Sequence, residues 1–484
     1  MADRISRRNF NQVAGNALLI SASGVLASCA EKPQPVAPAS SKTALVAPKG
    51  KLSMTNGKVD LRVPVGAPAG ETWRYGLTFP FQLAPRTAAA FCNIRGKRGH
   101  DFEVGTDVIV FGDVVKIQPE KTIALSRNHE ETNPHTDPAG KPAIMVKYPV
   151  RGGFVPIGAK LSDGTPHPHA GTGFGASQAM AWTPNQDRSY DKAEAYEYME
   201  LYQLRYDGKV FQLTGTERIP YDRLLTGATL SNPGLSNAIP DGEDLLFPMS
   251  GVTQKATAAQ AGVVRWKRGE QGWRPISWMP ITPEDQSFEP TLIRDVDGTL
   301  LFCARGASEP EYYDIRIWRS DDRGQRWNKI IHVRGLISSS PICLNQASDG
   351  TPYIAANLYE VFLKPVPPPF SPRRDKEGRE RLGGWLRDKL CLWPLNAERT
   401  GLEVPTIVRD CTAEFGPAPG GVSWNADHAS SKTVQLADGG WHDVIGLRIC
   451  ARAEVWGGID PPEQTGAYLE EVSCSGPVHP GWSF

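Results

Sequence analysis

The sequence predicts an all-β protein built as a β-propeller, with six blades expected, and two features carry that prediction. One is the stretch 287–327, in which three strand-like segments and a compact turn follow one another as in a single propeller blade. The other is a recurring Asp-Gly pair, of the kind that joins two strands of a hairpin. Its irregular spacing fits blades with loops of variable length, and unrelated hairpins of a β-sandwich are the alternative. The pairs are Asp163-Gly164, Asp241-Gly242, Asp297-Gly298, Asp349-Gly350 and Asp438-Gly439.

The compact turn at the end of this stretch follows the pattern S-x-D-x-G-x-x-W. Its residues are Ser320, Asp322, Gly324 and Trp327. The Ser and Asp side chains can hydrogen-bond to the backbone of the turn, the glycine can adopt a positive φ, and the tryptophan can pack beneath. We therefore expect a structural turn, called the Asp box below, between two strands of the blade.

The order of these features resembles the sialidase superfamily. In that family an acidic residue precedes a strand, an Asp-Gly turn leads to a strand that ends in arginine, and an Asp box follows. Glu289, Asp297-Gly298, Arg305 and the Asp box occupy these places here. The resemblance implies a sialidase-type propeller. It says less about activity, because the Asp box in the family is structural and lies away from the active site.

The composition limits the partners of the chain. It has 484 residues with 53 basic and 53 acidic side chains, so its zero net charge predicts neither nucleic-acid binding nor an anionic membrane surface as partner. Its cysteines are scattered without a C-x-x-C pair, which favours buried thiols over a metal cluster. No metal or cofactor is expected. The 13 Trp, 13 Tyr and 16 Phe residues suit a sheet protein that stacks on sugars.

The N-terminus predicts export. Residues 6–10 read Ser-Arg-Arg-Asn-Phe and resemble a twin-arginine signal, and residues 26–29 resemble a bacterial lipobox that would make Cys29 a lipidated residue. The alternative is an ordinary signal peptide that is cleaved nearby. We expect a signal at 1–29, a flexible linker at 30–50, and a periplasmic or cell-surface lipoprotein held to the membrane only by its lipid.

Two regions follow the linker. Residues 51–150 are predicted to form a β-rich N-terminal segment, and residues 151–484 the sialidase-like propeller. Asp207-Gly208 resembles a degenerate Asp box. The insertion 361–384, rich in proline and charge, is expected to overhang the site.

The family resemblance also implies a site. Sialidases hold the substrate carboxylate with three arginines, and they use a tyrosine nucleophile assisted by Glu together with an Asp acid. Glu289 falls at the place of the assisting Glu, Arg305 at the second arginine, and Arg387 is a candidate for the third. The alternative for each arginine is a surface salt bridge.

Two places depart from the family pattern. Ala429 stands where the tyrosine is expected, with His428 beside it. A loop containing His167 and His169 takes the place of the first arginine strand. Two histidines spaced in this way could bind a metal on one face of a strand, but the sequence shows no third ligand. An ordinary glycine- and proline-rich loop is the alternative.

These residues predict one cleft at the propeller centre, on the side opposite the Asp box. We expect Glu289, His428, Asp427 and His169 to be catalytic, with Asp427 orienting His428 as a proton carrier. The substrate would be bound by Arg305, Arg387, His167, Tyr313 and Trp424. Strand packing is the alternative for Tyr313.

The expected function is that of an exported carbohydrate-active enzyme, a sialidase-like glycoside hydrolase whose glycan partner carries an acidic sugar. One alternative is a polysaccharide lyase that uses histidine as its base. Another is a propeller that binds glycans without catalysis, because a fold does not determine a function.

Overall fold

The computed structural model describes most of the chain after residue 73. The described residues are 53–54, 74–95, 105–112, 122–125, 135–136, 142–147, 149–184, 190–253, 259–283, 288–306, 313–358, 373–374, 380–381, 387–420, 423–452, 459, 462–473 and 479–484. The predicted signal, Cys29 and the linker lie outside these residues, as does most of the insertion 361–384. Within them, no helix is long and apolar enough to cross a membrane.

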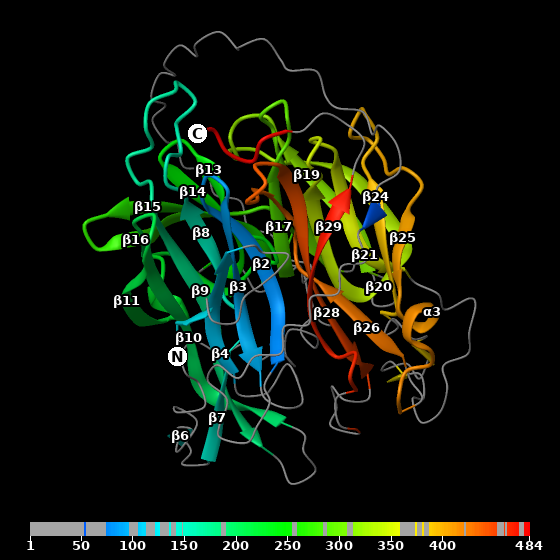
Figure 1. Cartoon of the computed structure of the whole chain (residues 1–484). Helices are drawn as coiled ribbons and strands as arrows, with labels where there is room; N and C mark the ends of the chain where they lie inside the picture. The colour runs from blue at the N-terminus through cyan, green and yellow to red at the C-terminus, as the bar shows by residue number, and fades with distance from the viewer. Residues whose placement is uncertain are drawn as a thin grey trace, which may run out of the picture.

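Antiparallel strands form nearly all of the described structure and gather into sheets (Figure 1). The first sheet contains β2 (Arg74–Ala84), β3 (Thr87–Arg95), β4 (Gly105–Gly112) and β5 (Thr122–Ala124). The second contains β6 (His135–Thr136), β7 (Pro142–Lys147), β8 (Arg151–Val155), β9 (Thr172–Pro184), β10 (Tyr190–Tyr206) and β11 (Phe211–Pro220). The third contains β12 (Ala228–Pro233), β13 (Ile239–Asp241), β14 (Asp244–Thr253), β15 (Gln260–Gly269) and β16 (Gly272–Pro280).

The second half of the chain forms two further large sheets. The fourth contains β17 (Phe288–Arg294), β18 (Leu300–Arg305), β19 (Tyr313–Ser320), β20 (Asn328–Gln346), β21 (Pro352–Leu358), β24 (Lys389–Pro394) and β25 (Thr406–Asp410). The fifth contains β26 (Trp424–His428), β27 (Lys432–Gln435), β28 (Trp441–Ala451), β29 (Gly466–Ser473) and β1 (Ser53–Met54). The small elements are η3 (Tyr221–Arg223), α3 (Cys411–Phe415) and the pair β22 (Arg373–Arg374) and β23 (Glu380–Arg381).

The sheets form a closed ring, which confirms the predicted β-propeller. Contacts run from β2 to β8, from β8 to β14, from β14 to β17, from β17 to β20, from β20 to β26, and from β28 back to β2. The described residues form five blade sheets, whereas six blades were expected. The difference lies in β20, whose 19 residues belong to two successive meanders and join them into one seven-stranded sheet.

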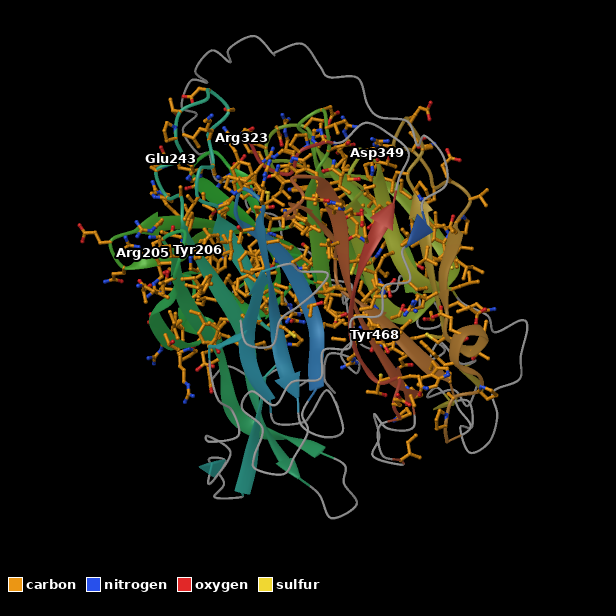
Figure 2. The ribbon with its side chains drawn as sticks, viewed as in Figure 1. Arg205, Tyr206, Glu243, Arg323, Asp349 and Tyr468 are labelled. Atoms are coloured by element: carbon orange, nitrogen blue, oxygen red, sulfur yellow. The ribbon has the colours of Figure 1, made fainter. Side chains whose placement is uncertain are left out.

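The Asp-Gly turns and the Asp box lie at one end of the ring, which we call the Asp-box end. Figure 2 shows Glu243, Arg323 and Asp349, from three of these turns, at the upper end of the molecule. In the Asp box the backbone N–H of Gly324 donates to Ser320 Oγ at 2.8 Å, and the N–H of residue 326 donates to Asp322 Oδ1 at 2.8 Å. Gly324 has a φ of 88°, as predicted.

Trp327 completes the Asp box. Its indole N–H donates to the carbonyl of Gly324 at 3.0 Å, and its ring meets Phe302 edge-on at 5.8 Å between centroids. The tryptophan therefore packs beside the turn, half-buried, and links the turn to the core between the third and fourth sheets.

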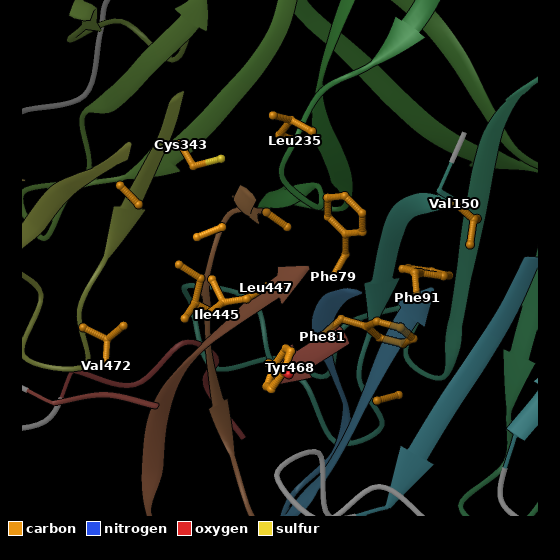
Figure 3. Close-up of a cluster of buried hydrophobic side chains, with 14 of the residues drawn as sticks. Phe79, Phe81, Phe91, Val150, Leu235, Cys343, Ile445, Leu447, Tyr468 and Val472 are labelled. Carbon is orange, nitrogen blue, oxygen red and sulfur yellow. The ribbon is translucent and has the colours of Figure 1, made fainter. Parts of the chain in front are cut away.

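The propeller axis is filled by residues 233–238, which we call the central segment. Leu235 is 2% exposed and belongs to the same buried cluster as Phe79 and Cys343 (Figure 3). The backbone N–H of Leu235 donates to the carbonyl of Pro290, and its carbonyl accepts from Ser430 N–H, both at 2.8 Å.

Asn237 holds the central segment to the other side of the ring. Its side-chain amide donates to the carbonyls of Phe79 and Pro80, at 3.0 and 2.8 Å, and its Oδ1 accepts from Gly152 N–H at 3.1 Å. The central segment thus satisfies polar backbone groups of inner strands from several sheets, which a buried loop must do.

Candidate functional site

Glu289 and Arg305 form an ion pair at the end of the β17–β18 hairpin opposite the Asp-box end. Arg305 Nη1 donates to Glu289 Oε2 at 2.7 Å, and the two side chains are only 12% and 14% exposed. The strand register requires this position, because Phe288 pairs with Arg305 at one end of the hairpin, whereas Arg294 pairs with Leu300 beside the Asp-Gly turn. We call the end that carries this pair the open end.

Glu289 has a strained backbone. Its φ is 51°, in the left-handed region that residues other than glycine rarely adopt. The strain falls at a bulge of β17, between Phe288 and Thr291. Such strain costs on the order of 1–3 kcal/mol and concentrates at functional sites. The ion pair to Arg305 helps to hold Glu289 in place.

Asp427 lies at the centre of a second group of charges at the open end. Its Oδ1 accepts from Arg387 Nη1 and its Oδ2 accepts from Arg448 Nη2, both at 2.6 Å. Asp427 is 2% exposed, and the arginines are 15% and 8% exposed. Asp427 was predicted to orient His428, but both of its carboxylate oxygens are taken by arginines instead.

His428 follows Asp427 at the end of β26. It is completely buried, and its Nε2 donates to the carbonyl of Ala355 at 2.8 Å. Its carbonyl accepts a weak hydrogen bond from the thiol of Cys343, at 3.9 Å. Burial raises the pKa of the Cys343 thiol, and the charges of Glu289 and Arg305 also act on that thiol.

Burial also decides what His428 can do. It lowers the pKa of His428 to about 4, so the ring is neutral at pH 7. Nδ1 is then an acceptor, and it has no hydrogen-bond partner among the described residues. The prediction that His428 carries a proton to or from the substrate is not supported, because the ring has no solvent-exposed face.

Arg151 is a charged residue of the site that the sequence reasoning missed. It begins the inner strand β8, and its Nε and Nη2 donate to the carbonyls of Gly234 and Pro233 at 2.8 and 3.2 Å. Nη1 donates to the carbonyl of Pro149. Arg151 therefore anchors the central segment. Its position in the sequence, before the Asp163-Gly164 pair, is the feature that could have identified it as a residue of the site.

The loop histidines lie at the opposite end of the propeller, which corrects the expected grouping with Glu289. The Nε2 atom of His167 is 3.1 Å from the carbonyl of Gly242, in the turn after β13. The neighbouring Asp241 pairs with Arg323 of the Asp box. His169 packs edge-on against Trp273 at 5.5 Å. The loop follows β8, so its histidines leave the inner strand at the Asp-box end.

Trp424 does not offer a surface for sugar stacking. It is 1% exposed, donates its indole N–H to the carbonyl of Gly416 at 2.9 Å, and packs edge-on against Phe415. This packing corrects the predicted role in substrate binding. The side chain of Tyr313 lies outside the described part of the structure.

Buried polar groups adjoin the second charged group. Asn357 donates through Nδ2 to the carbonyls of Arg387 and Ala426, both at 3.0 Å. The Oδ1 atoms of Asn357 and Asn425 are buried and have no hydrogen-bond partner among the described residues. Unsatisfied buried acceptors are costly, and the hydroxyl of a ligand or a water molecule would satisfy them.

The described residues at the open end include four arginines and two carboxylates, namely Arg151, Arg305, Arg387, Arg448, Glu289 and Asp427. We call these six residues the central cluster. Its excess of arginine makes it suited to an anionic ligand. Among the described residues, no group of three or more His, Cys, Asp or Glu side chains is placed to hold a metal ion.

No protein-family model matches the chain. No curated protein matches it in sequence. Solved structures that align with it include a Trypanosoma rangeli sialidase in complex with the inhibitor DANA, at 11% identity and a TM-score of 0.48, over 88% of this chain and 60% of the sialidase. This chain thus spans less than two thirds of that sialidase's length.

Two other aligned structures have similar values. The Hadza microbial sialidase Hz136 is 9% identical with a TM-score of 0.47, over 83% of this chain and 66% of that one. A protein of unknown function from Dyadobacter fermentans DSM 18053 is 13% identical with a TM-score of 0.45, over 82% of this chain and 94% of that one.

Proposed function

We propose that this protein is an exported glycoside hydrolase that acts on a glycan bearing an acidic sugar. The observation that carries the proposal is the central cluster, in which arginines outnumber carboxylates at the open end of the propeller. Arg305 and Arg387 are its partly exposed arginines, at 12% and 15%. An arginine side chain matches a sugar carboxylate with two parallel hydrogen bonds, so these two residues are the candidates for substrate recognition.

The proposed acid–base residues are Glu289, which is 14% exposed, and Asp427, which is 2% exposed and reaches a substrate only once Arg387 and Arg448 move away from it. Glycoside hydrolysis generally needs two carboxyl groups, one to protonate the leaving oxygen and one to act as base or nucleophile. Each carboxylate is held by arginine. An incoming sugar carboxylate would compete for those arginines and release the carboxylate for proton transfer. The strained backbone of Glu289 favours such a rearrangement.

A non-catalytic glycan-binding protein is the second candidate. Ala429 is buried at the place where the family has its tyrosine, and His428 is buried with a lowered pKa. Neither residue supplies a nucleophile. The same burial disfavours the lyase alternative, because a base that abstracts a proton must reach the substrate.

Activity assays on the full chain distinguish these functions. The protein is incubated with oligosaccharides that end in sialate or uronate residues. New reducing ends indicate hydrolysis, the absorbance of an unsaturated uronate indicates a lyase, and saturable binding without turnover indicates the second candidate.

Arg305→Gln tests the role of the central cluster. We expect it to lower kcat/KM for the acidic glycan, because it removes the charge that holds the sugar. The expected loss of transition-state stabilisation is about 2–5 kcal/mol. Arg326→Gln is the matched control, since Arg326 is 88% exposed in the Asp box at the other end. Equal activity of Arg305→Gln and the wild type would exclude the central cluster as the substrate site.

A further inference from the structure

A pocket of about 420 Å³ lies at the Asp-box end, away from the central cluster. Its walls are β14, β15 and β16 of the third sheet on one side and the Asp box of the fourth sheet on the other. Arg323, which lines the pocket, lies at the upper end of the molecule near Glu243 (Figure 2). The volume lies within the range of small-molecule sites, about 300–1,000 Å³.

The strand register builds the wall of this pocket. Leu246 pairs with Arg265, and Arg265 pairs in turn with Ser277. Val263, two residues before Arg265, pairs with Met279. Because side chains alternate between the two faces of a sheet, these residues share one face. The wall therefore combines an apolar part, Leu246, Val263 and Met279, with polar groups nearby.

Buried charge underlies the polar part of the pocket. The side chain of Asp241 is 3% exposed and accepts from Arg265, Arg294 and Arg323, at 2.8, 3.0 and 3.1 Å. Burial acts to raise the pKa of Asp241, but these arginines hold it below its ordinary value, so the carboxylate is charged. Asp244 accepts from Arg265 at 3.1 Å. Of the residues that line the pocket, Arg265 and Arg323 are basic and Asp244 is acidic.

Arg323 is the accessible cation of the pocket. Its side chain is 67% exposed although it contacts Asp241, so its guanidinium still meets solvent. The backbone of Arg323 has a φ of 59° and stands in the Asp box, whose hydrogen bonds from Gly324 and Arg326 fix the turn. The turn and the contact with Asp241 both restrict Arg323, which reduces the conformational freedom that it loses when it binds a ligand.

We infer that this pocket is a second carbohydrate subsite, which binds a sugar residue carrying a carboxylate independently of the central cluster. Arg323 binds the carboxylate through paired N–H donors. Ser277 and Gln325 hydrogen-bond the sugar hydroxyls, and the apolar wall around Met279 packs against the C–H face of the ring. Binding at this subsite involves no hydrolysis, so the inference does not depend on whether the central cluster is catalytic.

Ligand-observed NMR on the full chain tests this subsite. Glucuronate is the probe, and glucose is the matched neutral sugar. We expect saturable binding of glucuronate, about tenfold tighter than that of glucose, because one charge-assisted contact is worth about that factor. In an Arg305→Gln background, where the central cluster does not contribute, Arg323→Gln should weaken glucuronate binding about tenfold and bring it to the level of glucose.

Three further variants localise the binding. Ser277→Trp places a large side chain on an exposed residue of the wall and should block both sugars. Arg326→Gln removes a neighbouring charge that does not line the pocket and should leave binding unchanged. Arg305→Gln removes the contribution of the central cluster, and the glucuronate binding that remains should still depend on Arg323 and Ser277.

Two results would overturn the inference. One is the absence of saturable glucuronate binding at concentrations of tens of millimolar. The other is binding that persists in Arg323→Gln and Ser277→Trp but is lost in Arg305→Gln, which would assign the sugar to the central cluster. Unfolding midpoints show whether each variant is folded. If Ser277→Trp is not folded, the result for Arg323→Gln decides the test.

Discussion

Asp427→Asn should destabilise the protein strongly, because it removes the negative charge from between two largely buried arginines. Asp427 is 2% exposed and accepts at 2.6 Å from both Arg387 and Arg448. Removing one partner of a buried ion pair costs about 3–5 kcal/mol, since the remaining charge stays desolvated. The variant keeps one carbonyl acceptor, so we expect a loss at the lower end, about 3 kcal/mol.

Urea unfolding followed by tryptophan fluorescence measures this loss from the shift of the midpoint at a constant slope. Glu217→Gln is the matched control, because it breaks an ion pair between Glu217 and Arg274 whose side chains are 52% and 30% exposed. Exposed pairs contribute about 0–1 kcal/mol. If Asp427→Asn changed the free energy of unfolding by no more than the control, the second charged group would not depend on Asp427.

A double variant separates the ion pair from other effects of the substitution. Arg448→Gln alone should also destabilise the protein, since it leaves Asp427 with one arginine. Adding Asp427→Asn to Arg448→Gln should cost less than it does in the wild type, because part of the interaction is already lost. Strictly additive losses would contradict a direct interaction between the two side chains.

Trp327→Ala should lower the free energy of unfolding by about 2–4 kcal/mol in the same urea titration, because the indole is half-buried and bonded to the Asp-box turn. Gly234→Ala should unfold the protein or lower its stability by more than the Trp327 variant in the same urea titration, since a Cβ there would lie 2.1 Å from the carbonyl oxygen of Pro290. Burial raises the pKa of Asp443 to about 7, so above about pH 4 the native protein retains a proton that the unfolded chain has lost, and the free energy of unfolding falls as pH rises from about 4 to 7. Asp443→Asn should remove this fall, which amounts to up to about 1.4 kcal/mol per pH unit, when it is compared with the wild type in parallel urea titrations. Cys29→Ser should release the protein from the membrane fraction if Cys29 carries the lipid, and unchanged fractionation and processing would contradict the lipoprotein prediction.

Local sequence patterns were sufficient to predict the features whose interacting groups are close in the chain. The Asp box joins Ser320, Asp322 and Gly324 within a few residues, so its pattern specifies its hydrogen bonds. The pair of Glu289 and Arg305 spans one hairpin, and the Asp-Gly turn between the two strands sets the register that brings them together. In both cases the contacting groups are close in the chain, and turn chemistry alone places them.

Contacts between residues that are distant in the sequence depend on how the sheets pack. Asp427 faces Arg387 and Arg448 because an inner strand lies beside two other segments, and no local pattern distinguishes this contact from the predicted one with His428. The joining of two meanders through β20 likewise depends on a pairing that the sequence does not encode locally.

Local sequence patterns also do not show at which end of an inner strand a side chain lies. His169 was grouped with Glu289, yet it leaves β8 at the Asp-box end, whereas Arg151 at the start of β8 anchors the central segment. A strand of five residues spans about 17 Å, so an error of one strand length moves a side chain from one end of the propeller to the other. Long-range packing sets which end each residue occupies, and therefore which residues form the site.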